Sequence, residues 1–267
     1  MLYYLKRTVI GIVCVFKSNE FHVEYIESEI AHPVLWESHC HAQFEMIAVA
    51  EGDITVLLEG ETHRLKENQA IMIPPLFYHS ITANEKGSYR RVTALFDIDG
   101  IPKVLQEEFV ARGRKTAIEA SKVKKIKNIC QNERPDFYAP LLQSLMVELF
   151  YDALCFAPSP AEMEADEFLQ TSLRYIEEHL HEKILLDDLA RATVRSKSSF
   201  CHLFEEKMKI SPKRYILQKK LAFASKLIDE GVPRTVAAMQ VGYENYSNFY
   251  RVYTKHFGTR KKKKSSE

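Results

Sequence analysis

The stretch Gly242–Gly258, GYENYSNFYRVYTKHFG, predicts a short turn followed by one amphipathic helix. Asn245 or Ser247 is suited to cap the start of the helix, and Gly258 is suited to end it in a left-handed conformation. Four apolar residues fall on one face of a helix with 3.6 residues per turn: Phe249, Val252, Tyr253 and Phe257.

An upstream stretch, Ser198–Lys209, repeats this layout as SSFCHLFEEKMK. Apolar spacing alone is common to any two amphipathic helices. The two stretches also share the run Ser-x-Phe-x-[His/Arg]-[Leu/Val]-[Phe/Tyr], which favours a duplicated unit. The aligned pairs are Ser198 and Ser247, Phe200 and Phe249, His202 and Arg251, Leu203 and Val252, and Phe204 and Tyr253.

Each copy lies in a series of short helices. Ser196 is placed to cap the first copy, and Pro212 is placed in the first turn of a longer helix. Two short helices separated by a tight turn form a helix-turn-helix, so the pattern predicts two of them. The expected helices cover 168–180, 185–193, 197–208, 212–228, 236–240 and 245–257.

The charge is unevenly distributed along the chain. Its 267 residues suffice for two ordinary domains, and the formal net charge is +1. Residues 167–267 carry a net charge of +8 and residues 1–166 a net charge of −7. A basic half joined to an acidic half is typical of a nucleic-acid-binding module attached to another domain. Part of the basic excess is the run Arg260–Lys264, which could also serve only solubility.

The cysteines and the N-terminus indicate a cytoplasmic protein. The five cysteines form no CxxC pair and are odd in number, which argues against a disulfide framework and a zinc ribbon. The apolar run Thr8–Phe16 follows Lys6 and Arg7 but lacks a cleavage site, so a buried strand is expected rather than a signal peptide. No apolar run is long enough for a membrane-spanning helix.

Short apolar or alternating runs between residues 21 and 97 predict a β-barrel or sandwich. Residues 103–131 and 138–156 change to helical spacing. The second of these helices could cover the barrel or pair with a second copy of the chain, and both alternatives stay open. The expected organisation is a domain at 1–156, a linker at 157–167 and a helical domain at 168–267. The fold class is α+β with two domains.

Histidines mark the predicted barrel. His39, His41 and Glu45 share a face if they lie on one continuous strand, and His79 follows in PPLFYH. The spacing resembles the two cupin motifs, in which such residues converge on one divalent metal. Imidazole and carboxylate suit iron, manganese, nickel or zinc. No other cofactor is expected. A metal site, a metal-free effector pocket and a purely structural role stay open. Candidates to line the pocket are Trp36, Phe44, Phe77 and Tyr78.

The C-terminal hundred residues closely resemble the AraC/XylS family of bacterial transcriptional regulators, and the N-terminal half resembles it loosely. The resemblance rests on Leu186–Ala190, Ser196–Pro212, Lys220–Ile228 and Gly242–Gly258. It implies a cupin-like barrel with accessory helices and a seven-helix domain. In that domain a long helix, Pro212–Asp229, joins two helix-turn-helix motifs.

The resemblance also implies the partners and the DNA-binding positions. It implies a homodimer that binds promoter DNA, RNA polymerase and a small effector such as a sugar or another metabolite. Activation is the usual mode in the family. Carried over, the outward positions are Ser198, Ser199, Cys201, His202, Tyr246, Ser247, Asn248, Tyr250, Arg251 and Lys255.

Three departures from the family pattern stand out. Arg234 and Ala237 stand in the second motif where the family usually has aliphatic residues, so the helix ahead of the second recognition helix is expected to pack less well. After Gly258 the chain reads TRKKKKSSE, so the last short helix is expected to be frayed or missing. Glu205 and Glu206 repel phosphate, so the second motif and the basic tail are expected to supply most of the electrostatic affinity.

Two other functions compete with that of a regulator. A metal-dependent cupin enzyme with a helical appendage would explain the histidines, and a non-specific nucleoid protein would explain the basic tail. Neither needs two matched helix-turn-helix units, so the sequence favours an effector-controlled, sequence-specific regulator without enzymatic activity.

Overall fold

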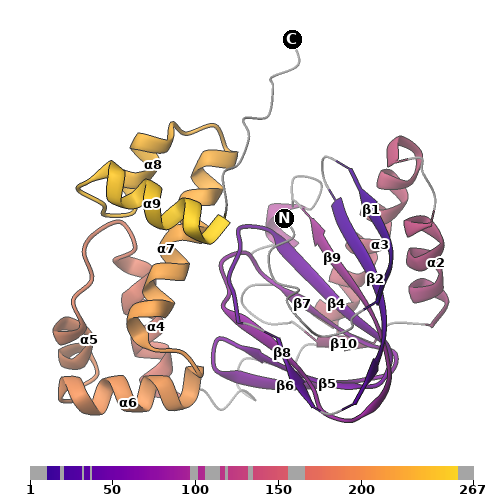
Figure 1. Cartoon of the computed structure of the whole chain (residues 1–267), viewed down its shortest axis with the longest axis horizontal. Helices are drawn as coiled ribbons and strands as arrows, with labels where there is room; N and C mark the ends of the chain where they lie inside the picture. Colours follow the sequence, from indigo (N-terminus) through magenta and orange to yellow (C-terminus); the bar gives the residue numbers. More distant parts are fainter. Residues whose placement is uncertain are drawn as a thin grey trace. The chain divides into compact units, whose positions relative to one another are not determined.

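The computed structural model describes residues 11–18, 21–31, 33–36, 38–96, 102–105, 115–117, 120–131, 135–155 and 166–257. The chain divides into two compact units, and the break falls between Ala165 and Asp166 (Figure 1). Most of the expected linker at 157–167 lies outside the described residues. Glu167, its last residue, is the first residue of helix α4.

The N-terminal unit contains two antiparallel sheets, which confirms the expected cupin-like β-fold. The first sheet has the order β1-β2-β9-β4-β7-β10 and the second has the order β3-β8-β5-β6. The strands are Gly11–Lys17 (β1), Phe21–Ile30 (β2), Val34–Leu35 (β3), Phe44–Glu51 (β4), Asp53–Leu58 (β5), Glu61–Lys66 (β6), Gln69–Ile73 (β7), His79–Ala83 (β8), Gly87–Phe96 (β9) and Lys115–Ala117 (β10).

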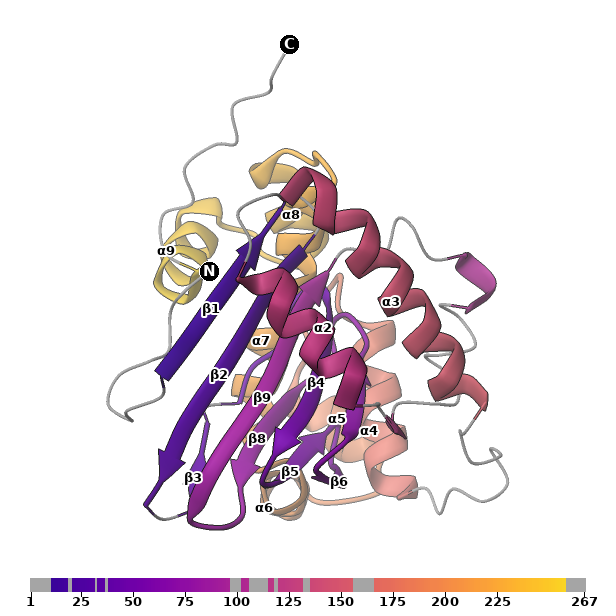
Figure 2. The same cartoon turned by 90° about the vertical axis from the view of Figure 1, so that its right-hand side faces the viewer.

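Helices α2 (Ala120–Cys130) and α3 (Pro135–Cys155) cover the outer face of the first sheet (Figure 2). Successive residues of a strand point to opposite faces of the sheet, and β4 is buried on both faces. Phe44, Met46 and Ala48 pack in a helix-side core with α2 and α3. Ile47 and Val49 pack in an inter-sheet core with the second sheet. Glu45 shares the inward register of Ile47 and Val49, so the strand aims its carboxylate between the sheets.

Three expectations about this unit need correction. Lys115–Ala117 lies in a range expected to be helical but forms strand β10 on the free edge of β7. The residues after Pro74 and Pro75 were not among the runs expected to form strands, but His79–Ala83 forms strand β8. Phe44 does not line a pocket mouth: it stacks on Phe96 in the helix-side core, with the ring centroids 5.8 Å apart.

Helix α3 packs on the sheet through the apolar face expected from its sequence. Leu142, Leu145 and Leu149 are buried in the helix-side core. Leu141 is 49% exposed and so does not contribute to this packing. Covering the sheet therefore accounts for most of the apolar face of α3.

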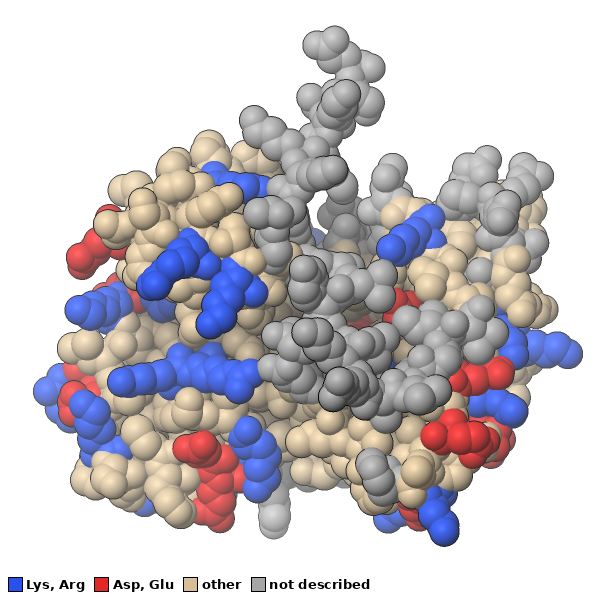
Figure 3. Space-filling model, in the orientation of Figure 1, with Lys and Arg blue, Asp and Glu red and all other residues tan. Residues whose placement is uncertain are grey.

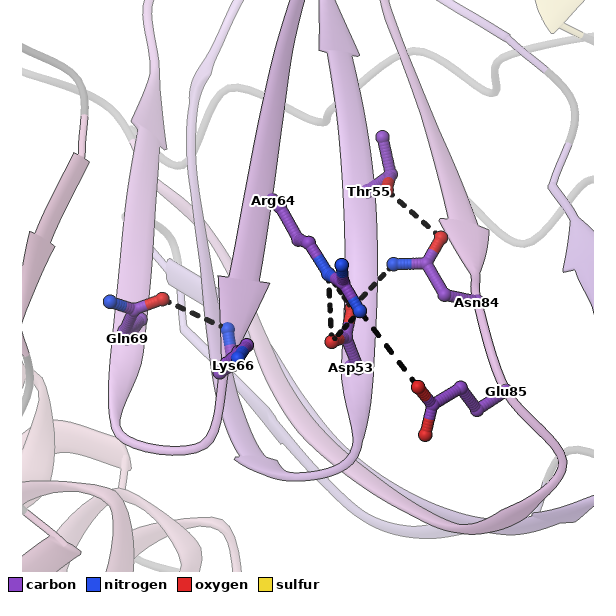
Figure 4. A network of polar contacts seen from close by, with 7 residues as sticks. All are labelled: Asp53, Thr55, Arg64, Lys66, Gln69, Asn84 and Glu85. Carbon is purple, nitrogen blue, oxygen red and sulfur yellow. Dashed lines mark hydrogen bonds and ion pairs between the residues drawn. The ribbon is translucent and has the colours of Figure 1, made fainter.

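A polar network closes one end of the second sheet (Figure 4). Asp53 accepts hydrogen bonds from Arg64 Nε at 2.9 Å and from Asn84 Nδ2 at 2.5 Å. Thr55 Oγ1 donates to Asn84 Oδ1 at 2.9 Å. These bonds tie the β5–β6 hairpin to the end of β8, the strand that carries His79.

The C-terminal unit is helical, as the sequence predicted. Ser196 Oγ accepts from the Ser199 backbone N–H at 3.3 Å, and Asn245 Oδ1 accepts from that of Asn248 at 3.1 Å. Both expected N-terminal caps are thereby confirmed. Gly258 lies outside the described residues. The helices are Glu167–Glu178 (α4), Leu186–Ala192 (α5), Lys197–Met208 (α6), Pro212–Asp229 (α7), Arg234–Gln240 (α8) and Tyr246–Phe257 (α9).

The duplicated apolar pattern fills the core of this unit. Phe200 and Phe204 of α6 are fully buried, and so are Phe249 and Tyr253 of α9. Helix α8 buries Ala237 and Ala238 but leaves Met239 71% exposed, so no large side chain of α8 is buried. Among the described helices, none combines the length and the apolarity needed to cross a bilayer.

Lys220 connects the two motifs. It lies on α7 and is buried, and its Nζ donates to the carbonyl oxygens of Val241, at 2.8 Å, and Glu182. Gly242 packs against the same Glu182 backbone, in the left-handed region with φ of 75°. A Cβ on Gly242 would lie 2.7 Å from the Glu182 carbonyl carbon, closer than such atoms approach. Only glycine fits there.

We predict that Gly242→Ala destabilises the helical unit by about 3 kcal/mol, from the left-handed strain and the overlap with Glu182 together. Gly231→Ala is the matched control, because Gly231 also has a positive φ, of 92°, but has open space around its Cα. We expect it to cost about 1 kcal/mol. Hydrogen exchange of the α7 amides reports the stability of this unit alone. Equal losses in the two variants would contradict the packing argument.

Candidate functional site

Four predicted ligand residues converge between the sheets. One ligand atom from each of His39, His41, Glu45 and His79 lies within 4.8 Å of the other three. Glu45 and His79 are buried, and His39 and His41 are half-buried. The structure thus brings together residues from two segments that are far apart in the sequence.

The route by which they meet differs from the expected one. His39, His41 and Glu45 do not lie on one continuous strand, because residues 40–43 are irregular and β4 begins at Phe44. His39 instead forms an isolated antiparallel bridge with His79 at the start of β8. The backbone N–H of each residue donates to the other's carbonyl, at 2.9 and 3.0 Å. This bridge, rather than strand parity, places His39 beside the other three.

The backbone fixes the orientation of two imidazoles. Nδ1 of His41 lies 2.9 Å from the Gln43 carbonyl oxygen, and Nδ1 of His79 lies 3.0 Å from that of Phe77. A carbonyl oxygen can only accept, so both Nδ1 atoms carry the proton. Nε2 of each ring then faces Oε2 of Glu45 at 2.9 Å. A neutral imidazole would point the lone pair of its Nε2 atom at the Glu45 carboxylate, which would be repulsive. Each of these two histidine–glutamate contacts therefore requires a positive charge at Nε2.

The pKa shifts point the same way. Burial alone would raise the pKa of Glu45, but its contacts with His41 and His79 hold that pKa well below the usual range. Burial would lower the pKa of His79, but the Glu45 carboxylate outweighs it and raises that pKa. The positive charge can be a proton on each ring or a metal ion bound to both Nε2 atoms. Nδ1–H donated to a carbonyl is the usual support of a metal-bound histidine, so the residues fit a metal.

The three other pocket candidates, Trp36, Phe77 and Tyr78, lie outside this four-residue cluster. Trp36 is half-buried against the inter-sheet core and stacks on Tyr89, with centroids 5.6 Å apart. Phe77 also packs on that core. Tyr78 is buried just before β8, where its backbone N–H donates to Glu59 Oε1 at 2.8 Å.

The predicted DNA-contacting residues lie on the outward faces of α6 and α9. In α9, Arg251 Nη2 donates to Asn248 Oδ1 at 3.2 Å, so the two polar side chains are oriented together. In α6, His202 Nδ1 lies 3.9 Å from Glu206, which places an acid beside the equivalent position. Cys201 is half-buried. The exposed ones are Ser198, Ser199, His202, Tyr246, Ser247, Asn248, Tyr250, Arg251 and Lys255.

Basic side chains outnumber acidic ones on the face of the helical unit seen in Figure 3. The basic tail, Arg260–Lys264, lies outside the described residues, and so does the seventh helix that the resemblance implies. Residues 166–257 form α4–α9, with a helix-turn-helix in α5–α6 and another in α8–α9.

Family comparisons fit this two-part organisation. The model of the AraC-like ligand binding domain matches residues 20–149, and a helix-turn-helix domain model matches residues 189–261. The chain belongs to the AraC family. This agrees with the resemblance found in the sequence, since the ligand-binding match covers the N-terminal unit and the helix-turn-helix match covers the helical unit.

Relatives of the chain match it over different lengths. The HTH-type transcriptional regulator YdiP of Escherichia coli is 28% identical over 124 residues, which span 46% of this chain and 40% of YdiP. YobQ of Bacillus subtilis, also named an HTH-type transcriptional regulator, is 24% identical over 84% of this chain and 86% of its own. The crystal structure of unsaturated fatty acid bound ToxT from Vibrio cholerae is 10% identical, covers 89% of this chain and 92% of that chain, and gives a TM-score of 0.44.

The sequence interpretation missed a second polar group between the sheets. It comprises Tyr89, Arg91 and Thr93 on β9, which share the inward register. Their strand reads YRRVTALF, and the alternation with buried Val92 and Ala94 was the available signal. An arginine at an inward position of such a strand marks a polar interior.

We predict that the chelator-treated protein binds one equivalent of a divalent metal such as Zn²⁺ or Ni²⁺, with a rise in melting temperature. His39→Ala/His41→Ala should lose both effects, because it removes two of the four ligand atoms. His202→Ala, which removes an exposed imidazole from α6, is the control. Isothermal titration and elemental analysis measure the stoichiometry. Absence of stoichiometric metal in the parent protein would rule out the metal site.

Proposed function

We propose that the chain is a sequence-specific transcriptional regulator. It binds promoter DNA through α6 and α9, and a small molecule bound between the sheets of the N-terminal unit controls it. The observation that carries this proposal is the matched pair of capped helices, each with an apolar face in the core and a polar face exposed. One helix fits the major groove of DNA, and two on one rigid unit can enter successive turns about 34 Å apart.

The two recognition helices are proposed to contribute unequally. Helix α9 exposes Arg251 and Lys255, whereas α6 exposes Glu205 and Glu206 near His202. Cations that neutralise phosphate release counterions and strengthen binding on any sequence. We therefore assign most of the electrostatic affinity to α9 and to the basic tail, and we assign base recognition to both helices.

The remaining partners follow from family membership and are proposals. We propose a homodimer that activates transcription together with RNA polymerase in the cytoplasm. The proposed effector domain is 1–156, the linker 157–167 and the DNA-binding domain 168–267. The group formed by His39, His41, Glu45 and His79, which we call the histidine cluster, could also serve a metal-dependent enzyme. Such an enzyme, however, would not need two exposed recognition helices. Sequence-specific DNA binding is therefore the property that separates the two functions.

We predict that Arg251→Ala weakens binding to the operator by about 1–3 kcal/mol, as expected for an arginine that reads a guanine. The operator comes from genome-wide mapping of the DNA bound by the parent protein. Gel-shift titration on the operator and on scrambled DNA gives the affinity and the specificity ratio at one fixed salt concentration.

Arg174→Ala is the matched control, because it removes the same charge from α4, outside both motifs. We expect it to weaken binding equally on every sequence, and only slightly. If Arg251→Ala keeps the affinity and the specificity ratio of the parent protein, Arg251 reads no base. If the parent protein binds no operator, the proposed function is wrong.

A further inference from the structure

Arg91 is a buried cation without an anionic partner. It lies on β9 and is 9% exposed, and it shares the inward register of Tyr89. Its Nε and Nη1 are buried and make no hydrogen bond. Among the residues that the structure describes, none forms an ion pair with it. A buried charge without a partner strongly destabilises a folded protein, so an arginine in this state requires a physical explanation.

Aromatic rings hold the guanidinium in place. It lies over Trp36 at 5.0 Å and near Tyr89 at 5.9 Å from the ring centroids, and the two rings stack on each other. These contacts fix the direction of its N–H groups without satisfying them. Burial raises the pKa of Tyr89, and the charge and side-chain contact of Arg91 offset part of that rise, so the phenol stays neutral.

Three neighbouring polar atoms are also buried without a hydrogen bond: Trp36 Nε1, Tyr89 Oη and Thr93 Oγ1. Arginine and tryptophan can only donate, and the two hydroxyls can donate as well. The group formed by Trp36, Tyr89, Arg91 and Thr93, which we call the arginine cluster, therefore offers donors and one positive charge. What complements it is a ligand that accepts hydrogen bonds and carries a negative charge.

A carboxylate that interacts electrostatically with Arg91 is already engaged. Glu24, on the adjacent strand β2, bonds His22 Nε2 at 2.8 Å. That bond lowers the pKa of Glu24, with a smaller contribution from Arg91. Glu24 thus adds to the field around Arg91 but leaves its N–H groups unsatisfied.

The arginine cluster is separate from the histidine cluster. Arg91 pairs with Val49 on β4, whereas Glu45 pairs with Leu95. Four residues along a strand correspond to about 13 Å. The two clusters therefore face the same space between the sheets at different positions. The role inferred for the arginine cluster does not depend on a metal in the histidine cluster.

We propose that the arginine cluster binds the carboxylate of a small organic acid, and that this acid is the effector of the regulator. The second part rests on the proposed function. The guanidinium edge matches a carboxylate with two parallel hydrogen bonds. A monocarboxylate with an apolar body fits better than a phosphate, because one cation neutralises one charge and the walls are Trp36, Tyr89 and the inter-sheet core.

The test uses the purified full chain with sodium benzoate as the probe and with benzamide as its neutral isostere. Melting temperature and calorimetric titration are followed at constant ionic strength in the parent protein, in Arg91→Met and in Arg90→Met. Arg90 is the matched control, because it directly precedes Arg91 on the same strand but is exposed and forms an ion pair with Glu51. Arg91→Lys, which keeps the charge but not the planar fork, guards against misfolding of the methionine variant.

We expect benzoate to raise the melting temperature of the parent protein and of Arg90→Met. Arg91→Met should bind it at least about tenfold more weakly, with Arg91→Lys in between. Without ligand, Arg91→Met should melt no lower than the parent protein, because it removes an unpaired buried charge. The proposal is overturned if benzoate up to millimolar concentrations has no effect, if benzamide or inorganic phosphate acts as strongly, or if Arg91→Met responds like the parent protein.

The link to regulation is read out separately. Benzoate should change the operator affinity of the parent protein and leave that of Arg91→Met unchanged. A benzoate site without any effect on DNA affinity would overturn the effector assignment and keep the binding site. Loss of operator binding in every condition would contradict the proposed function and leave the carboxylate site standing.

Discussion

The buried ammonium of Lys220 sets the geometry on which the helical unit depends. It donates to the Glu182 carbonyl, ahead of the first helix-turn-helix, and to the Val241 carbonyl, in the turn of the second. Burial lowers the pKa of Lys220, so its two carbonyl partners are what keep a lysine there. Gly242 completes the contact, since only its missing side chain lets the second turn approach Glu182. The two motifs are thereby fixed to each other as well as to the connecting helix α7.

In the N-terminal unit the corresponding constraint is strand alternation on a sheet buried on both faces. The first sheet places Phe44, Met46 and Ala48 under the helices and turns Glu45 inward. The same rule turns Tyr89, Arg91 and Thr93 inward from β9. A core that is apolar on one face and partly polar on the other can hold a ligand without giving up its packing. The space between the sheets is partly polar because Glu45 and Arg91 occupy inward-facing positions of their strands.

Local signals predicted most of the helical unit. The caps Ser196 and Asn245, Pro212 and the repeated Phe positions are decided by nearby residues, and the structure confirms each. Lys220 could not be predicted to be buried, because a lysine on an amphipathic helix ordinarily faces water. Its role depends on two turns distant in the sequence.

The barrel shows the same limit. The residues of the histidine cluster were predicted from their spacing. The bridge between His39 and His79 that brings them together was not, because strand β8, which follows two prolines, was not recognised as a strand. Strand β10 owes its conformation to the free edge of β7 rather than to its own three residues. The burial of Arg91 follows from its inward parity on β9, but Arg90 and Arg91 are adjacent and sequence alone does not decide which of the two faces the interior.

Helices α6 and α9 are proposed to bind DNA together as one rigid unit. Methylation interference at guanine N7 on the mapped operator tests it most directly, because that atom lies in the major groove. Two clusters of interfering guanines on one face of the duplex, about 10 base pairs apart, are predicted for each bound helical unit. A single cluster, or two clusters on opposite faces of the duplex, would show that α6 and α9 do not enter successive turns of the major groove together.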